Sequence, residues 1–164
     1  MAQQKALRVA VVTVSDSAAL RTRDDRSGPA VADRCRALGW DVVSREILPD
    51  ETIAISEKLV TLANSGSCDV ILTTGGTGVG PRDITPEATA NMCEKLVPGL
   101  AERMRQQGMR ATPRAALSRA VAGVRGRVLI VNLPGSPKGA VESLEAVAEL
   151  LPHAAEVIGG ARHD

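Results

Sequence analysis

Three short runs rich in valine, leucine and isoleucine constrain the fold of this 164-residue chain most strongly. They are "LRVAVVTV" at 7–14, "CDVILTT" at 68–74 and "RVLIVNLP" at 127–134. Runs of this length that are almost continuously apolar are typical of strands buried on both faces, as in a parallel sheet. A further segment, "WDVVSREIL" at 40–48, is also predicted to be a strand.

The segments between the first three strands read as one loop and two helices. Residues 15–27 are polar and predict a loop, after which a helix runs from Ser27, its N-cap, to Gly39. A second helix is predicted from Thr52 to about Asn64. This alternation predicts an α/β fold, with a doubly wound, mostly parallel sheet flanked by helices. The length suits a single domain over residues 1–164.

The second half of the chain is predicted to be mainly helical. Thr85 is expected to cap a helix over residues 86–96, and another helix is expected over about 98–107. Residues 112–126 predict a short helix and a connection with room for a short strand. A long helix is predicted after "GSP" at 135–137, with an apolar face formed by Val141, Leu144, Ala148 and Leu151.

Charge and composition argue against two classes of partner. The net charge is +1 and Trp40 is the one aromatic residue, so nucleic acid would find neither a broad basic surface nor stacking platforms. No apolar run approaches 18 residues, which argues against a membrane span. An aspartate follows the first apolar run, which favours a strand over a signal peptide. We expect a cytoplasmic protein that binds no nucleic acid and no membrane.

Cysteine and histidine offer little chemistry in this sequence. The three cysteines are odd in number and lack C-x-x-C spacing, so neither a disulfide framework nor a zinc site is indicated. Buried, inert thiols are expected at Cys35, Cys68 and Cys93. Both histidines, His153 and His163, lie near the C-terminus, and a histidine-based catalytic triad is not expected.

Two glycine-bearing segments follow predicted strands: "TTGGTGVG" at 73–80 and "NLPGSPKG" at 132–139. Ligands of open α/β sheets bind beyond the carboxyl ends of the strands, where glycine-rich backbone can turn its N–H groups toward phosphate. The two common glycine-rich phosphate motifs are absent. The alternative is a tight turn with positive φ at two or three glycines. That alternative does not explain Gly75, Gly76, Gly78 and Gly80 together, so anion binding is favoured.

Two aspartates follow strands near these glycines. A carboxylate such as Asp83 beside a bound phosphate is repelled unless a cation lies between them, and Mg²⁺ binds both kinds of oxygen. Asp50, after the second strand, could converge on the same ion. The alternatives are a surface Asp83 paired with Arg82, and Asp50 as the N-cap of the helix that starts near Thr52.

Seven arginines lie between residues 103 and 127, with no acidic residue among them. Such a run is usually a solvated face of the protein. It could also receive an anionic substrate, because the guanidinium fork suits phosphate.

The segment "LTTGGTGVGPRDITPEAT" resembles the molybdenum-cofactor biosynthesis family of the MogA and MoaB type. The blocks "TVSDS", "DRSGP", "LPDE", "PGLAERMR", "LSRAVAGVRG" and "VNLPGSPKGAVESL" extend the resemblance over about residues 12–145. It implies a doubly wound α/β domain and a Mg²⁺-dependent molybdopterin adenylyltransferase. Such an enzyme transfers AMP from ATP to the terminal phosphate of molybdopterin and releases pyrophosphate. It also implies a homo-oligomer, most often a trimer and in some members a hexamer, and other cofactor-biosynthesis proteins as partners.

The resemblance assigns roles to particular positions. Asp50 of "PDE" and Asp83 of "RDITPEA" would be catalytic and hold Mg²⁺, and Ser118 of "LSR" would hold molybdopterin. Asp16, Asp25 and Arg119 lie in matching blocks with a less defined role. The other expected ligand-binding positions are Thr74, Gly75, Gly76, Thr77, Gly78, Asn132, Pro134, Gly135 and Ser136.

The resemblance leaves two alternatives to the transferase. Some MoaB-type members keep the fold without the activity, so the first is a non-catalytic molybdopterin-binding or scaffold protein. The second is a nucleotide hydrolase that uses the same loop without a pterin. This chain retains both acids, Ser118 and the "LSRAVAGVRG" block, which favours the enzyme.

Overall fold

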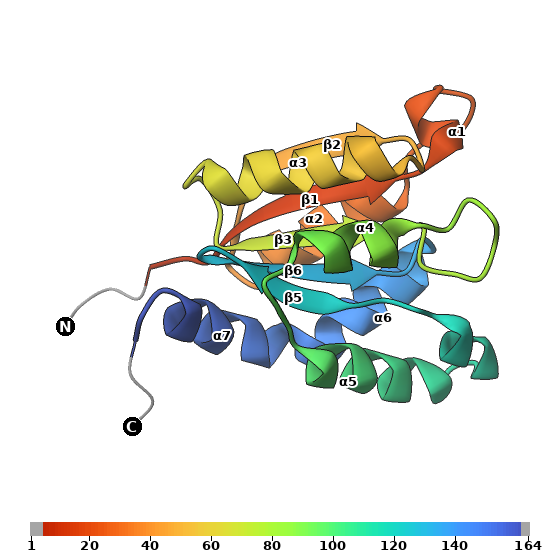
Figure 1. Cartoon of the computed structure of the whole chain (residues 1–164). Coiled ribbons are helices and arrows are strands. Elements are labelled where there is room, and N and C mark those ends of the chain that lie inside the picture. Colours follow the sequence, from red (N-terminus) through yellow and green to blue (C-terminus); the bar gives the residue numbers. More distant parts are fainter. Residues whose placement is uncertain (1–4, 162–164) are drawn as a thin grey trace.

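A six-stranded sheet lies between two layers of helices, with the strand order β2-β1-β3-β6-β5-β4 (Figure 1). The computed structural model describes residues 5–161. The strands β2, β1, β3 and β6 are parallel, and β5 and β4 complete the sheet in antiparallel pairing. The predicted α/β fold with a mostly parallel sheet is confirmed. The strands are β1 Arg8–Val14, β2 Asp41–Leu48, β3 Val70–Thr74, β4 Lys95–Leu96, β5 Ala122–Arg125 and β6 Val128–Leu133.

The apolar runs form the centre of the sheet. Every residue of β3 and β6 is buried, and so is all of β1 except Arg8. These strands are covered on both faces, which is why their sequences are continuously apolar rather than alternating. β2 lies at an edge and alternates between exposed and half-buried residues.

Each face of the sheet has its own helices and its own core. One core joins residues of β1, β3 and β6 to four helices, and the other joins the opposite face of these strands to two. The first set is α2 Ser27–Ala37, α5 Pro98–Met109, α6 Pro137–Val147 and α7 Leu151–Ile158; the second is α3 Thr52–Asn64 and α4 Thr85–Met92. Two short elements, α1 Asp16–Ala19 and the 3₁₀ helix η1 Pro113–Leu117, lie with the loop after β3 at the carboxyl end of the sheet (Figure 1).

The expected N-caps of two helices are wrong. Ser27 is the first residue of α2 rather than its cap, and it is buried. The amide of Gly28 instead donates to Asp25 Oδ1 at 3.0 Å, so Asp25 satisfies this helix start. Thr85 is likewise the first residue of α4, which follows Ile84.

Three expected element boundaries also differ. The loop predicted over 15–27 contains α1, and the helix predicted over 86–96 ends at Met92 because Lys95–Leu96 pairs as β4 with β5. The predicted long C-terminal helix is divided into α6, a 3₁₀ turn at Ala148–Leu150 and α7. Pro152 lies in the first turn of α7, where its missing N–H costs nothing, whereas inside one continuous helix it would remove a hydrogen bond.

The aliphatic core encloses two of the three cysteines. Cys35 and Cys68 are buried, and burial raises the pKa of each thiol to about 11, as expected for inert residues. Cys93 is half-buried, and burial raises the pKa of its thiol as well. His153 lies on α7, and His163 lies outside the described residues. Within residues 5–161, no helix has the length and apolar character needed to cross a membrane.

Candidate active site

The two glycine-bearing loops lie against each other beyond the carboxyl ends of β3 and β6. The Gly75 amide donates to the Leu133 carbonyl at 3.1 Å, and the Thr74 hydroxyl donates to the Pro134 carbonyl at 2.6 Å. A Cβ on Gly135 would lie 3.3 Å from Gly75 Cα. The predicted convergence of both loops at this edge is therefore observed, with backbone packed on backbone.

Glycine is required in this loop for two different reasons. Gly75 and Gly76 have φ of +105° and +68°, and a Cβ on Gly75 would lie 2.2 Å from the Val14 carbonyl oxygen. Gly78 and Gly80 have no positive φ, but a Cβ on either would lie 2.8 or 2.9 Å from Asp83 Oδ2. A tight turn thus explains the first two glycines only, and the other two make room for the Asp83 carboxylate.

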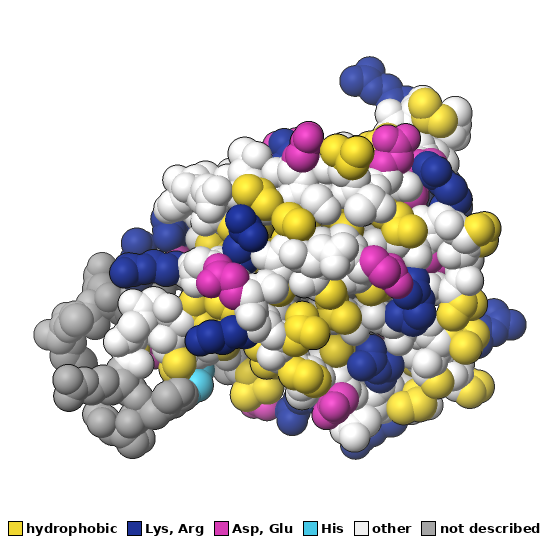
Figure 2. Space-filling view, in the orientation of Figure 1, with side chains coloured by type: hydrophobic (Ala, Val, Ile, Leu, Met, Phe, Trp, Pro, Cys, Tyr) yellow, Lys and Arg dark blue, Asp and Glu magenta, His cyan; other side chains and the backbone are white. Residues whose placement is uncertain are grey.

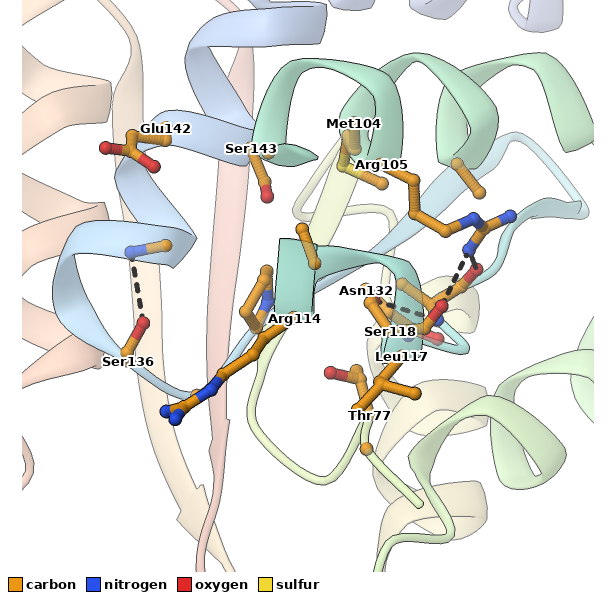
Figure 3. A pocket seen from close by; sticks show the side chains of 18 of the residues that line it. Thr77, Met104, Arg105, Arg114, Leu117, Ser118, Asn132, Ser136, Glu142 and Ser143 are labelled. Carbon is orange, nitrogen blue, oxygen red and sulfur yellow. Dashed lines mark hydrogen bonds between the residues drawn. The ribbon is translucent and has the colours of Figure 1, made fainter. Parts of the chain in front are cut away.

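Two adjoining cavities open at this end of the sheet. The first, of about 560 Å³, extends toward α5 and η1 and is lined by Ser118 and Arg105, among others (Figure 3). The second, of about 490 Å³, extends toward the segment after β1 and contains Asp25 and Asp50. Both cavities are lined by the same four residues at their border: Gly76, Asp83, Gly135 and Ser136.

Asp50 is oriented by the backbone of α1. Its Oδ2 accepts the Asp16 amide at 2.8 Å, and its own amide donates to Asp16 Oδ1 at 2.9 Å. The alternative in which Asp50 caps α3 is wrong, because the N-cap position of that helix is Glu51. Burial raises the pKa of Asp50, and the nearby Asp16 and Asp83 carboxylates raise it further. Asp50 therefore lies close enough to Asp83 for their charges to interact.

Asp83 is held by its own loop rather than by Arg82. Its Oδ2 accepts the Gly80 amide at 2.9 Å. The alternative pairing with Arg82 is wrong, because the Arg82 guanidinium donates to both carboxylate oxygens of Asp16, each at 2.9 Å. That interaction holds the pKa of the Asp16 carboxyl below its usual range.

The carboxylate oxygens of Asp50 and Asp83 suit a hard cation such as Mg²⁺. Asp50 Oδ1 and Asp83 Oδ1 accept no hydrogen bond from the described residues, and both side chains line the second cavity. The buried Thr85 hydroxyl also has no hydrogen-bond partner within residues 5–161, and it lies 2.3 Å from where a Cβ on Gly76 would be. No group of three His, Cys, Asp or Glu side chains in residues 5–161 could hold a metal by itself. Two carboxylates with phosphate and water oxygens are the usual surroundings of Mg²⁺.

Arg119 holds the glycine loop through hydrogen bonds to its carbonyl groups. Its guanidinium donates to the carbonyls of Gly78 and Asp83, each at 2.7 Å, and pairs with Glu87 of α4. Its amide donates to the Thr77 carbonyl at 2.8 Å. Arg119 therefore positions the loop, and Glu87, which sequence reasoning did not include in the site, is its counterion.

The arginine run is only partly a solvated face. Arg105 donates to the carbonyls of Ser118 and Ala120, and Arg103 pairs with Glu149. Arg114 of η1 lines the first cavity, and its guanidinium has no partner among the described residues (Figure 3). The acids that neutralise part of this run come from other elements, so no local pattern could reveal them.

Several expected ligand-binding residues have their polar atoms engaged within the protein. Buried Asn132 donates to the hydroxyls of Thr73 and Thr89 and accepts the Val121 amide. Asp25 accepts the Thr13 hydroxyl at 2.8 Å as well as the Gly28 amide. Both still line a cavity, as do Pro134 and the α6 cap Ser136, and their contact with a ligand stays a prediction.

Comparison with known proteins places this geometry in a family. Residues 10–153 match the family described as "Probable molybdopterin binding domain". The chain belongs to this family. It is 39% identical over 156 residues to the molybdopterin adenylyltransferase of Helicobacter pylori, covering 94% of this chain and 89% of that protein. It is 38% identical over 146 residues to that of Escherichia coli K12, covering 87% and 74%.

A solved structure agrees with the family assignment. The molybdopterin biosynthesis enzyme MoaB from Thermus thermophilus superposes with a TM-score of 0.89 at 50% sequence identity. The match covers 96% of this chain and 99% of that one. The expected resemblance to the MogA and MoaB type is confirmed.

If the site binds ATP and molybdopterin, as the resemblance implies, Gly76→Val should weaken both affinities at least about tenfold, a loss of about 1.4 kcal/mol. A side chain there would meet the Thr85 hydroxyl and strain a residue whose φ is +68°. Calorimetric titration of the folded variant measures both affinities. Gly66→Val is the matched control, because Gly66 also has positive φ, +70°, but a Cβ there meets no atom within 4 Å. Unchanged affinities in Gly76→Val would mean that this glycine serves the turn and not ligand binding.

Asp50→Asn is expected to raise the melting temperature at pH 7 slightly. The folded-state pKa of Asp50 is raised above 3.8, so its charged form opposes folding at neutral pH and ceases to do so as pH falls through that pKa. The gain should therefore disappear near pH 3. Thermal melts of Asp50→Asn and of Asp33→Asn, an exposed control on α2, provide the test. A lower melting temperature at pH 7 would contradict the electrostatic argument.

Proposed function

We propose that this protein is a molybdopterin adenylyltransferase of molybdenum cofactor biosynthesis. The terminal phosphate oxygen of molybdopterin attacks the α-phosphorus of ATP, the bond from that phosphorus to the bridging oxygen breaks, and pyrophosphate leaves. The observation that carries the proposal is the pair of cavities that meet at Gly76 and Asp83. A group transfer needs two substrates held side by side, and the named relatives support the choice of substrates.

The two cavities suit different substrates. The first is lined by Met104, Leu117 and Ala101 together with Arg105 and Ser118, which suits an apolar heterocycle with an anionic end, as in molybdopterin. The second is lined by carboxylates, including Asp50, and by Gly75 and Gly76. It would receive the triphosphate of ATP together with a cation. The phosphates of both substrates would then meet at the shared border.

The chain acts in this proposal by binding and orienting. Glycine-loop amides face phosphate oxygens, and Ser118 and the arginines of the first cavity retain the pterin. Asp50 and Asp83 are the residues that would hold Mg²⁺. When bound, Mg²⁺ neutralises negative charge on the phosphates. Phosphoryl-type transfer depends on positioning and charge neutralisation more than on acid–base groups, so a site without histidine is adequate.

Two alternatives remain as outcomes of the same assay. A non-catalytic molybdopterin-binding or scaffold protein would bind the pterin and release no pyrophosphate. A nucleotide hydrolase would consume ATP without pterin. Other molybdenum cofactor biosynthesis proteins as partners, and a cytoplasmic location, stay predictions from the sequence.

Asp50→Asn and Asp83→Asn are each expected to lower transferase turnover at least about 100-fold while the fold stays intact. Either change removes one of the two carboxylates that line the second cavity and would hold Mg²⁺. Pyrophosphate release is measured with ATP, Mg²⁺ and molybdopterin present, and again without the pterin. Asp33→Asn is the control, because Asp33 is an exposed residue of α2 that lines neither cavity. Normal turnover in both site variants would exclude the role given to the two acids.

The protein is expected to form a homotrimer, and a hexamer is the alternative assembly. Edge strand β2 exposes Val43 and Ile47, and Leu96 of the other edge strand is 52% exposed. Figure 2 shows further hydrophobic side chains between α4 and α5. Exposed apolar groups of this kind mark contact surfaces. Light scattering after size exclusion should give three times the 17.1 kDa of one chain. A mass near one chain at micromolar concentration would rule assembly out.

A further inference from the structure

The Asp50 carboxylate presents its two oxygens to different surroundings. Oδ2 accepts the Asp16 amide at 2.8 Å, whereas Oδ1 lies 3.0 Å from where a Cβ on Gly76 would be. The contact with Asp16 thus fixes which oxygen faces the glycine loop. A group that must meet a metal or a phosphate gains from such fixed orientation.

The contact between Asp16 and Asp50 is reciprocal. The Asp50 amide donates to Asp16 Oδ1 at 2.9 Å, and the neighbouring Ser15 amide donates to the Leu48 carbonyl at 2.8 Å. These bonds tie the segment after β1 to the segment after β2, which lie more than 30 residues apart in sequence. The four-residue helix α1 has little stability of its own, so these bonds determine where Asp16 lies.

Arg82 joins the glycine loop to this pair. Its Nε and Nη2 donate to Asp16 Oδ2 and Oδ1, each at 2.9 Å, in a two-pronged arrangement. Arg82 directly precedes Asp83 in the chain. A continuous series of contacts therefore runs from Asp83 through Arg82 and Asp16 to Asp50.

We propose that Asp16 and Arg82 are positioning residues that set the separation between Asp50 and Asp83. The inference rests on the proposed function, in which those two acids share one cation. Arg119 holds the carbonyls of the glycine loop but forms no hydrogen bond or ion pair with Asp16 or Asp50 within residues 5–161, whereas the bidentate Arg82–Asp16 interaction ties the loop to the Asp50 side. Without that interaction, the two like charges would move apart. Neither Asp16 nor Arg82 lines either cavity, although Ser15 and Ser17 line the second. Asp16 therefore acts through Asp50 rather than on a ligand.

Exposure separates this role from a role in stability. The side chains of Arg82 and Asp16 are 60% and 37% exposed, and ion pairs so accessible to water contribute little to folding. Their removal should leave the melting temperature nearly unchanged. It should nevertheless alter the geometry at the border of the cavities.

The test compares Arg82→Gln, Arg82→Lys, Asp16→Asn and the Asp16→Asn/Arg82→Gln double variant with the unmodified protein. Arg36→Gln, which breaks the exposed pair with Asp33 on α2, is the matched control. Binding of Mn²⁺ in the presence of a non-hydrolysable ATP analogue is followed by electron paramagnetic resonance. Pyrophosphate release gives kcat and KM in parallel, and thermal melting confirms folding.

Arg82→Gln is expected to weaken Mn²⁺ binding about tenfold and to lower kcat, with KM for molybdopterin changed less than about twofold. Arg82→Lys should restore little of the Mn²⁺ affinity or kcat, because an ammonium group cannot reproduce the bidentate interaction with Asp16. The Asp16→Asn/Arg82→Gln double variant should resemble the single variants, since one interaction is lost in all three. Arg36→Gln should match the unmodified protein.

The outcomes separate this inference from the proposed function. Mn²⁺ binding and kcat in Arg82→Gln equal to those of the unmodified protein would overturn the positioning role. An equal fall in all variants, Arg36→Gln included, would overturn it as well. Absence of pyrophosphate release from the unmodified protein would refute the transferase, while the Mn²⁺ comparison would still decide whether Arg82 and Asp16 position the acids.

Discussion

The close approach of backbone segments at the carboxyl end of the sheet is the constraint on which the site depends. β1, β3 and β6 are parallel neighbours, so their ends meet at one edge. Gly75 lies so close to the Val14 carbonyl that a Cβ would be 2.2 Å away, and Gly135 lies against Gly75. Because no side chain fits between these segments, two of the four residues that line both cavities are glycines, Gly76 and Gly135. Asp83 supplies a carboxylate at this border, and Asp50 supplies another in the second cavity.

Charge at this border is unbalanced in a way that a structural role does not explain. Asp16, Asp50 and Asp83 lie close together, yet Arg82 makes its bonds with Asp16 alone. Burial and the neighbouring carboxylates raise the pKa of Asp50, so its charged form is disfavoured in the folded protein. A protein keeps such an arrangement where a ligand supplies the missing positive charge. The imbalance therefore supports a site in which a divalent cation arrives with phosphate.

The sequence predicted the parts of the molecule whose cause is local. Apolar runs predicted the central strands, and the glycines with Asp50 and Asp83 predicted where the site would be. Contacts between distant segments determine the features that the sequence did not predict. Arg82 pairs with Asp16, 66 residues away, rather than with its neighbour Asp83. Burial of Ser27 and Thr85 removed both from the capping positions that their residue type favours. No local pattern contains the Arg82–Asp16 pairing, because the two residues lie on segments distant in sequence.

Arg119 shows how a residue can serve an anion site without reaching the ligand. Its amide and guanidinium bind the carbonyls of Thr77 and Gly78, which fixes the orientation of the two following peptide planes. In a trans peptide the C=O and N–H point in opposite directions, so the amides of Gly78 and Val79 are directed away from Arg119. Neither amide has an acceptor among the described residues. Arg119 thereby fixes the direction of these two loop amides, while Glu87 neutralises its guanidinium, so its contribution to an anion site is the orientation of N–H groups rather than charge.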